Sequence, residues 1–335
     1  MPSLRALPLL LAALTGVAAC SKADPGESKP PVVVAPEVTV KGIDTSTLTP
    51  RERREWSAEL TELLAPCPEV PVNLAQCIQE SRPCKACFPA AQLLLKQVQA
   101  GKTKKEREEA FHGRFDVNKI KQLTTDGSPE LGSPDAIVTI IEWADFECPY
   151  CRSVSPILDD LVKRFPGQVR VVFKFYPLGA HPHGEVAARA GVAAQNQGKF
   201  WEMHHMMFEN QERLEQADLD RYAKQLGLDM PRFRTDLTSK DTGERIEKEK
   251  KQAEEVGLEG TPFVFINGRY VDFALMPNPA DDLVEWVKVD IELAGKVPNI
   301  APSASASAGS PLKTPPATSA SAAPAASAGK PGKKE

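Results

Sequence analysis

The sequence predicts an α/β fold with an all-helical insertion, preceded by a small helical domain that contains cysteines. Residues 137–147 form an apolar run with β-branched side chains that ends at Cys148. From Val154 to Phe165, apolar residues recur at helical spacing, and residues 168–175 alternate as in a half-buried strand. Strand, helix and strand in this order form a right-handed unit with two parallel strands.

The composition and the start of the chain indicate an exported protein. The net charge of −4 over 335 residues argues against a nucleic-acid partner. Residues 1–20 read as a signal peptide, because the apolar run from Leu7 to Leu14 is too short to span a bilayer. Val17-Ala18-Ala19-Cys20 resembles a bacterial lipobox, which implies lipidation of Cys20 and a periplasmic, lipid-anchored protein, with the outer membrane favoured. The alternative is ordinary cleavage near Ala19.

The next part of the chain predicts a tether followed by a small domain. Residues 21–48 are rich in Pro, Lys, Val and Thr, and we expect a disordered tether there. Residues 49–122 should form three short helices. We expect them from Pro50 to Pro66, from Ala90 to Val98 with Gly101 as the terminator, and from the capping box at Thr103 to about Gly113.

Four cysteines, Cys67, Cys77, Cys84 and Cys87, lie in this small domain. An even number in an exported protein favours structural disulfides, with three pairings possible. A second redox-active pair at Cys84 and Cys87 and a Cys₄ zinc site are the alternatives. Cys84-Lys85-Ala86-Cys87, the leucine-rich helix after it, and Arg114-Phe115 resemble the cytochrome c maturation protein H family. That resemblance implies a thiol relay.

The remaining elements complete the α/β domain. Gly-Ser-Pro turns mark a linker at residues 123–134, and the domain should occupy residues 135–296. Its insertion, about residues 183–256, should contain three helices. We then expect a strand at 260–266, a turn at Asn267-Gly268, a strand at 269–273, a helix from Pro279 to Ala294 and a disordered Ala/Ser/Pro tail at 297–335.

Cys148 and Cys151 lie where a strand becomes a helix. Unpaired N–H groups and the helix dipole stabilise a thiolate at that point, so we predict a pKa below about 6 for Cys148. Pro149 suits the first helical turn. Glu142 should point inward on the preceding strand, where a raised pKa would let it take a proton from Cys151. A cross-strand ion pair with Lys174 is the alternative for Glu142.

Several separated motifs resemble the DsbA-like thioredoxin-fold oxidoreductases over residues 131–295. They are residues 145–151 (Asp-Phe-Glu-Cys-Pro-Tyr-Cys), His181-Pro182-His183, residues 198–201 (Gly-Lys-Phe-Trp) and Gly260-Thr261-Pro262. The resemblance implies that Cys148 attacks and Cys151 resolves. It also implies a cis Pro262 facing the cysteines, with Thr261, Pro149 and Tyr150 beside an incoming peptide.

We therefore expect an exported thiol–disulfide oxidoreductase acting on cysteines of envelope proteins, with a redox partner that re-oxidises or re-reduces its active pair. The direction of electron transfer stays open at this point. The alternatives are a reductase or relay in cytochrome c maturation that uses Cys84 and Cys87, and a non-catalytic peptide-binding or chaperone module. We expect no cofactor and no metal, because no three histidine or methionine donors share one face at ligand spacing.

Overall fold

The computed structural model describes residues 37–125 and 127–300. The predicted signal peptide, Cys20, the first part of the tether and the tail beyond residue 300 lie outside these ranges. Among the described helices, none combines the length and the apolar character needed to cross a bilayer.

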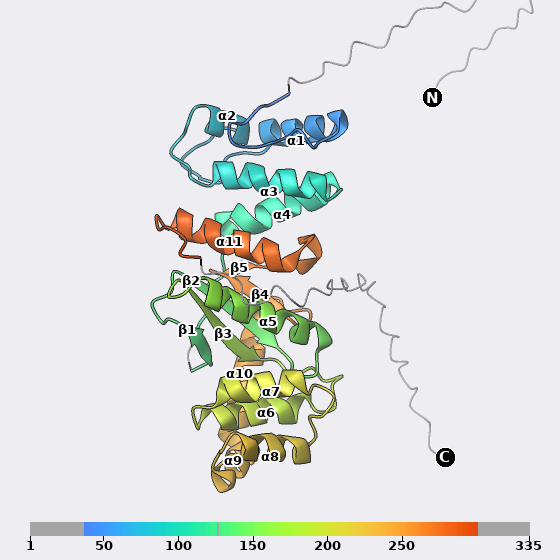
Figure 1. Cartoon of the computed structure of the whole chain (residues 1–335), viewed down its shortest axis with the longest axis vertical. Coiled ribbons are helices and arrows are strands. Elements are labelled where there is room, and N and C mark those ends of the chain that lie inside the picture. The colour runs from blue at the N-terminus through green and yellow to red at the C-terminus, as the bar shows by residue number, and fades with distance from the viewer. Residues whose placement is uncertain (1–36, 126, 301–335) are drawn as a thin grey trace, which may run out of the picture. The chain divides into compact units, whose positions relative to one another are not determined.

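A five-stranded sheet in the order β1-β3-β2-β4-β5 forms the centre of the second half of the chain (Figure 1). β2 (Val138–Ala144) and β3 (Val169–Phe175) are parallel and joined by α5 (Pro149–Arg164), as the sequence predicts. The other three strands are antiparallel to their neighbours. They are β1 (Glu130–Gly132), β4 (Phe263–Ile266) and β5 (Arg269–Tyr270).

Helices cover both faces of the sheet. On one face, α5 and α11 (Pro279–Leu293) pack apolar side chains such as Leu158 and Val287 against Ile140 of β2. On the other face, Ile141 and Trp143 pack against Ala253 of α10 (Lys240–Glu255). The layers follow from the strand pattern, since successive side chains of β2 point to opposite faces and nearly all of them are buried.

Glu249 of α10 accepts hydrogen bonds from three parts of the domain. Its Oε2 accepts from the Phe175 N–H at 2.6 Å, its Oε1 from the Ser128 hydroxyl at 2.8 Å, and its backbone carbonyl from the Trp143 indole at 2.9 Å. The inserted helix thereby pairs buried donors of the sheet that lack a strand partner there.

The insertion contains five helices, so the prediction of three is wrong. Gly198, with φ of +72°, separates the first two, and Ser239 caps the last one in an extended conformation. Each interruption divides a segment that we expected to be continuous. The helices are α6 (Gly184–Gln195), α7 (Phe200–Glu209), α8 (Gln216–Gln225), α9 (Met230–Thr238) and α10 (Lys240–Glu255).

The cysteine-containing region also has one α-helix more than predicted. Its helices are α1 (Pro50–Glu62), α2 (Leu74–Gln79), α3 (Cys87–Gln99) and α4 (Lys104–Phe115). The capping boxes at Thr49 and Thr103 are both formed. The additional helix, α2, has six residues, too few to show a helical period in the sequence.

Two segments predicted to be irregular contain ordered structure. Val40 and Leu48, in the predicted tether, are buried in the apolar cluster of α1 to α4. β1 lies inside the predicted linker and pairs with β3. At the other end, residues 297–300 are described, and Gln168 hydrogen-bonds to the backbone of Val297 and Asn299.

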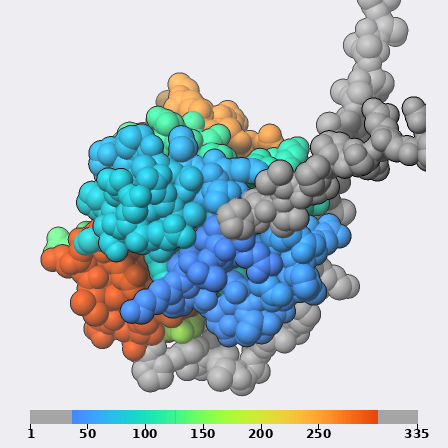
Figure 2. All heavy atoms as spheres, turned by 90° about the horizontal axis from the view of Figure 1, so that it is seen from above, coloured from blue at the N-terminus to red at the C-terminus, as the bar shows by residue number. Residues whose placement is uncertain are grey.

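The helical region contacts α11 through a buried ion pair. Arg114 of α4 lies 2.5 Å from Asp290 of α11, and its guanidinium carbon is 4.3 Å from the centroid of the Trp286 ring. Val289 and Leu293 of α11 pack against the same apolar cluster as α3. Figure 2 shows the surface made there by the blue-to-cyan N-terminal helices and the orange-red α11.

Replacing Arg114 by Met should lower the free energy of unfolding by about 3 kcal/mol, because Asp290 would stay buried without its cation. Lys104→Met is the matched control. Lys104 pairs with Glu62 on the exposed surface, so its loss should cost less than about 1 kcal/mol. Urea unfolding of the two variants compares these costs, and equal losses would contradict the prediction.

Candidate active site

Cys148 is the N-cap residue of α5, and a short turn separates it from the end of β2 at Ala144. The Cys148 N–H donates to the Asp145 carbonyl at 3.1 Å, which fixes the turn between strand and helix. Pro149 occupies the first helical position and is exposed, while Cys148 and Cys151 are free thiols that are 3% and 0% exposed. The helix therefore presents the Cys148 thiol at its N-terminus and places the Cys151 thiol one turn deeper.

The segment before β4 lies against Cys148. The Thr261–Pro262 peptide bond is cis, and the Cys148 thiol lies 3.3 Å from the Thr261 carbonyl. Because β4 is antiparallel to β2, its start meets the end of β2 at the same edge of the sheet. Thr261 and Pro262 are half-buried and thus partly accessible. The structure brings together these two residues and the cysteines.

The two thiols have opposite pKa shifts. A hydrogen bond from the Cys151 thiol lowers the pKa of Cys148 from an ordinary 9.0 to about 6, helped by the backbone N–H groups of Tyr150 and Cys151 and opposed by burial. Burial raises the pKa of Cys151 well above 9.0, and the adjacent Cys148 raises it further. At neutral pH, Cys148 is thus largely a thiolate and Cys151 a protonated thiol.

Glu142 lies beneath the cysteines in the middle of β2. It is 2% exposed, and its Oε1 has no hydrogen-bond partner among the described residues. Burial raises its pKa to about 8, and the charges of Asp159 and Cys148 add to this effect. The charge of Glu142 in turn contributes to the raised pKa of Cys151. This is the inward-facing carboxyl with a raised pKa that the sequence predicts.

The alternative ion pair between Glu142 and Lys174 is wrong. Glu142 is level with Phe173 of β3, whereas Lys174 is level with Trp143 and so points to the opposite face. There the Lys174 ammonium lies 5.6 Å from the Trp143 ring centroid and donates to Ser128.

Three side chains that the sequence analysis did not assign hold the loop before Cys148. Asp145 accepts hydrogen bonds from Glu147 N–H and Leu178 N–H and lies 2.8 Å from the His181 ring. Glu147 accepts from His183 N–H. The sequence shows the acidic residues Asp145 and Glu147 and the His181-Pro182-His183 segment, which could have indicated these contacts.

Gln211, after α7, contributes a third support for this loop. Its amide donates to the carbonyl groups of Phe146 and Cys148, both at 2.8 Å. Nothing in the sequence pattern distinguishes Gln211 from a surface glutamine.

A family model described as "Thioredoxin" matches residues 124–288, which include every element of this site. These residues form a domain with the thioredoxin fold. The observed sheet and its helical insertion confirm the predicted fold.

The chain is similar to curated proteins and solved structures over this domain. It is 42% identical over 139 residues to Na⁺/H⁺ antiporter NhaA 3 of Salinispora tropica and 43% identical over 138 residues to NhaA of Herminiimonas arsenicoxydans. Each match covers 41% of this chain and 21% or 22% of the relative, so the chain spans about a fifth of the length of these relatives.

Among solved structures, oxidised BdbD from Bacillus subtilis is 24% identical, with a TM-score of 0.47, over 52% of this chain and 97% of that chain. A thioredoxin-like oxidoreductase from Silicibacter pomeroyi is 25% identical, with a TM-score of 0.42, over 50% and 97% of the two chains.

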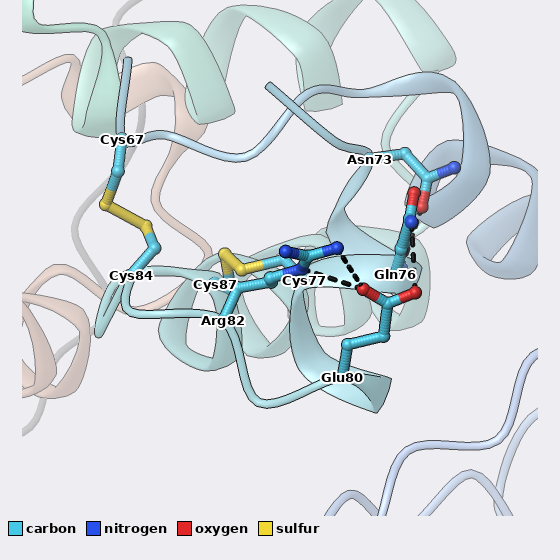
Figure 3. Close-up of a disulfide and its surroundings, with 8 residues drawn as sticks. All are labelled: Cys67, Asn73, Gln76, Cys77, Glu80, Arg82, Cys84 and Cys87. Atoms are coloured by element: carbon cyan, nitrogen blue, oxygen red, sulfur yellow. Dashed lines mark hydrogen bonds and ion pairs between the residues drawn. A yellow bond between two sulfur atoms is a disulfide. The ribbon is translucent and has the colours of Figure 1, made fainter. Parts of the chain in front are cut away.

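Outside the thioredoxin domain, the four N-terminal cysteines form two disulfides. Cys67 is bonded to Cys84, and Cys77 is bonded to Cys87 (Figure 3). Each member of the Cys84–Cys87 motif is therefore joined to an upstream cysteine and not to the other. Since zinc binds thiolates, this pairing and a Cys₄ zinc site exclude each other.

Replacing Cys77 and Cys87 together by Ala should lower stability by about 3 kcal/mol, because the bond closes a loop of 10 residues within a small apolar cluster. The matched variant, Cys67→Ala with Cys84→Ala, opens a loop of 17 residues and should cost about as much. Thermal unfolding of the full chain measures both losses. A stability unchanged in both variants would contradict a structural contribution of these bonds.

Proposed function

We propose that this chain is an exported protein thiol–disulfide oxidoreductase that exchanges disulfides with cysteines of envelope proteins. The observation that carries the proposal is the division of roles between the two free cysteines. Cys148, at the N-terminus of α5, has a pKa of about 6, while Cys151 is fully buried and stays protonated. A reactive outer thiolate with a protonated partner one turn deeper is the arrangement that thiol–disulfide exchange requires.

In the reducing direction, the Cys148 thiolate attacks one sulfur of a substrate disulfide, forms a mixed disulfide and displaces the other substrate sulfur as a thiolate. Cys151 then loses its proton and attacks the sulfur of Cys148. The Cys148–Cys151 disulfide forms and the second substrate thiolate leaves. The oxidising direction is the reverse of these steps, and a separate redox partner restores the starting state.

The neighbouring residues support this sequence of steps. Glu142 is the buried carboxyl that exchanges the proton of Cys151, which its pKa of about 8 suits near neutral pH. Thr261, Pro262, Pro149 and Tyr150 form the accessible rim around Cys148 where an extended substrate segment binds. The backbone of Thr261 lies beside the Cys148 sulfur and gives that segment a hydrogen-bonding edge.

Trapping of substrates tests the proposal. In the full chain, Cys151→Ala should accumulate mixed disulfides between Cys148 and envelope proteins, visible as adducts that a reductant releases. The double variant Cys148→Ser with Cys151→Ala is the control and should accumulate none. Adducts at equal levels in both variants, or full activity of Cys148→Ser, would favour a non-catalytic binding module.

We further propose that the mature chain is anchored in the membrane through a lipid on Cys20. The lipobox-like motif Val17-Ala18-Ala19-Cys20 supports this proposal.

 Replacing Cys20 by Ala should then release the protein from the membrane fraction into the soluble periplasmic fraction, with the site of cleavage read from the N-terminal mass. Retention of the variant in the outer-membrane fraction would contradict the lipid anchor.

A further inference from the structure

The two disulfides of the helical region lie against each other. The sulfurs of Cys77, Cys84 and Cys87 are all within 4.8 Å of one another, although Cys84 belongs to one disulfide and the other two form the second. Figure 3 shows the two sulfur–sulfur bonds side by side between the loop at Cys67 and the start of α3. A thiolate released at Cys84 would therefore lie beside an intact disulfide.

The four cysteines differ in burial, and this difference determines at which sulfur an incoming thiol can attack. Cys67 is half-buried, whereas Cys84, Cys77 and Cys87 are 5%, 1% and 2% exposed. A thiol from solution thus reaches the cluster at Cys67, and the sulfur that leaves is the inner one, Cys84. Cys84 precedes α3, a helix of 13 residues whose N-cap makes no side-chain hydrogen bond. The dipole of this helix favours negative charge on a sulfur near its N-terminus.

We propose that these four cysteines form a second thiol–disulfide exchange site, in which reduction at Cys67 is passed through Cys84 to the Cys77–Cys87 disulfide. An incoming thiolate attacks the Cys67 sulfur, forms a mixed disulfide there and displaces the Cys84 thiolate. Cys84 then attacks the Cys87 sulfur. The Cys84–Cys87 bond forms, the Cys77–Cys87 bond breaks, and the electron pair leaves on the Cys77 thiolate.

The substrate class is a solvent-borne thiol, on a protein or a small molecule. A second thiol of that donor, or another thiolate, releases Cys67 from the mixed disulfide. The net result is one disulfide reduced, one donor disulfide formed, and the remaining disulfide moved to the Cys84–Cys87 pair. The proposed exchange does not use Cys148 or Cys151. A negative result for this site can therefore be distinguished from a negative result for the proposed function.

Limited reduction of the full chain tests the proposal. The chain carries Cys148→Ser and Cys151→Ser, and one molar equivalent of a water-soluble phosphine reduces one disulfide without adding a thiol. After quenching and alkylation, cleavage after Glu69, Glu80 and Lys85 separates the four cysteines into different peptides. We expect a joined Cys84–Cys87 product with Cys67 and Cys77 alkylated. An intact Cys77–Cys87 bond with Cys67 and Cys84 alkylated would overturn the proposal.

A second variant tests the transfer step without a reductant. Cys67→Ser leaves Cys84 as a free thiol from the start, so Cys77 should become alkylated in the folded chain. The control, Cys67→Ser with Cys84→Ser, lacks the attacking sulfur and should keep Cys77 protected. Far-ultraviolet circular dichroism of both variants verifies that they fold alike. Equal alkylation of Cys77 in two folded variants would also overturn the proposal.

Discussion

A neutral alkylating reagent should modify Cys148 roughly tenfold faster at pH 7 than at pH 5, with little further increase above pH 7. The thiolate is the reactive form, and the pKa of Cys148 is about 6. A thiol with the ordinary value of 9.0 would instead react faster up to pH 9 and beyond. Mass spectrometry of the reduced protein after timed alkylation gives the rate at each pH.

Two variants provide the controls for this measurement. Cys148→Ser removes the fast reaction, which assigns it to that sulfur. Cys151→Ala removes the thiol that contributes most to the low pKa, so the midpoint of the profile should move to higher pH. A rate that still rises steeply between pH 7 and pH 9 in the unchanged protein would contradict the assigned pKa.

The same pKa couples the stability of the reduced protein to pH. The folded-state pKa of Cys148 lies below the ordinary value of 9.0, so the folded protein binds fewer protons between about pH 6 and pH 9. The stability that the Cys148 thiolate contributes is fully present above pH 9 and is lost as the pH falls through about 6.

Replacing Glu142 by Gln should stabilise the reduced protein by about 3 kcal/mol at pH 7 and by much less at pH 4.5. Burial raises the pKa of this carboxyl to about 8, so the folded state binds a proton that the unfolded state has released. The resulting cost grows from about pH 4.5 to pH 8, at about 1.4 kcal/mol for each pH unit. Gln matches the protonated carboxyl in shape and never ionises.

Urea unfolding at the two pH values measures this effect. The same variant should slow the release of substrate from Cys148, because Cys151 loses the group that exchanges its proton. A gain in stability together with slower resolution of the mixed disulfide would show that this carboxyl is kept for chemistry at a cost in stability. Equal stabilisation at pH 4.5 and pH 7 would contradict the raised pKa.

The elements that could be predicted from the sequence combine a long apolar period with clear signals at their ends. β2, α5 and β3 follow from uninterrupted apolar patterns, and the N-cap threonines define the starts of α1 and α4. The site followed from the position of Cys148 between strand and helix. These are local signals, and a single sequence displays them directly.

The features that escaped prediction depend on short elements or on distant partners. β1 has three residues and α2 has six, so neither shows a period. The disulfide pairing depends on how α2 and α3 pack together. Gln211 reaches Cys148 across 63 positions of sequence, and Lys174 was misassigned because one step along a strand reverses the face.

The hydrogen bonds of Glu249 determine how far this domain can be shortened. Removing the inserted helices would leave the Phe175 amide and the Trp143 indole inside the protein without an acceptor. Each such group costs about 1–3 kcal/mol when it is left buried and unpaired. A minimal version trimmed to the strands, α5 and α11 would therefore need replacement acceptors at both positions. The insertion therefore supplies hydrogen bonds on which the sheet depends, and removing it would lower the stability of the sheet.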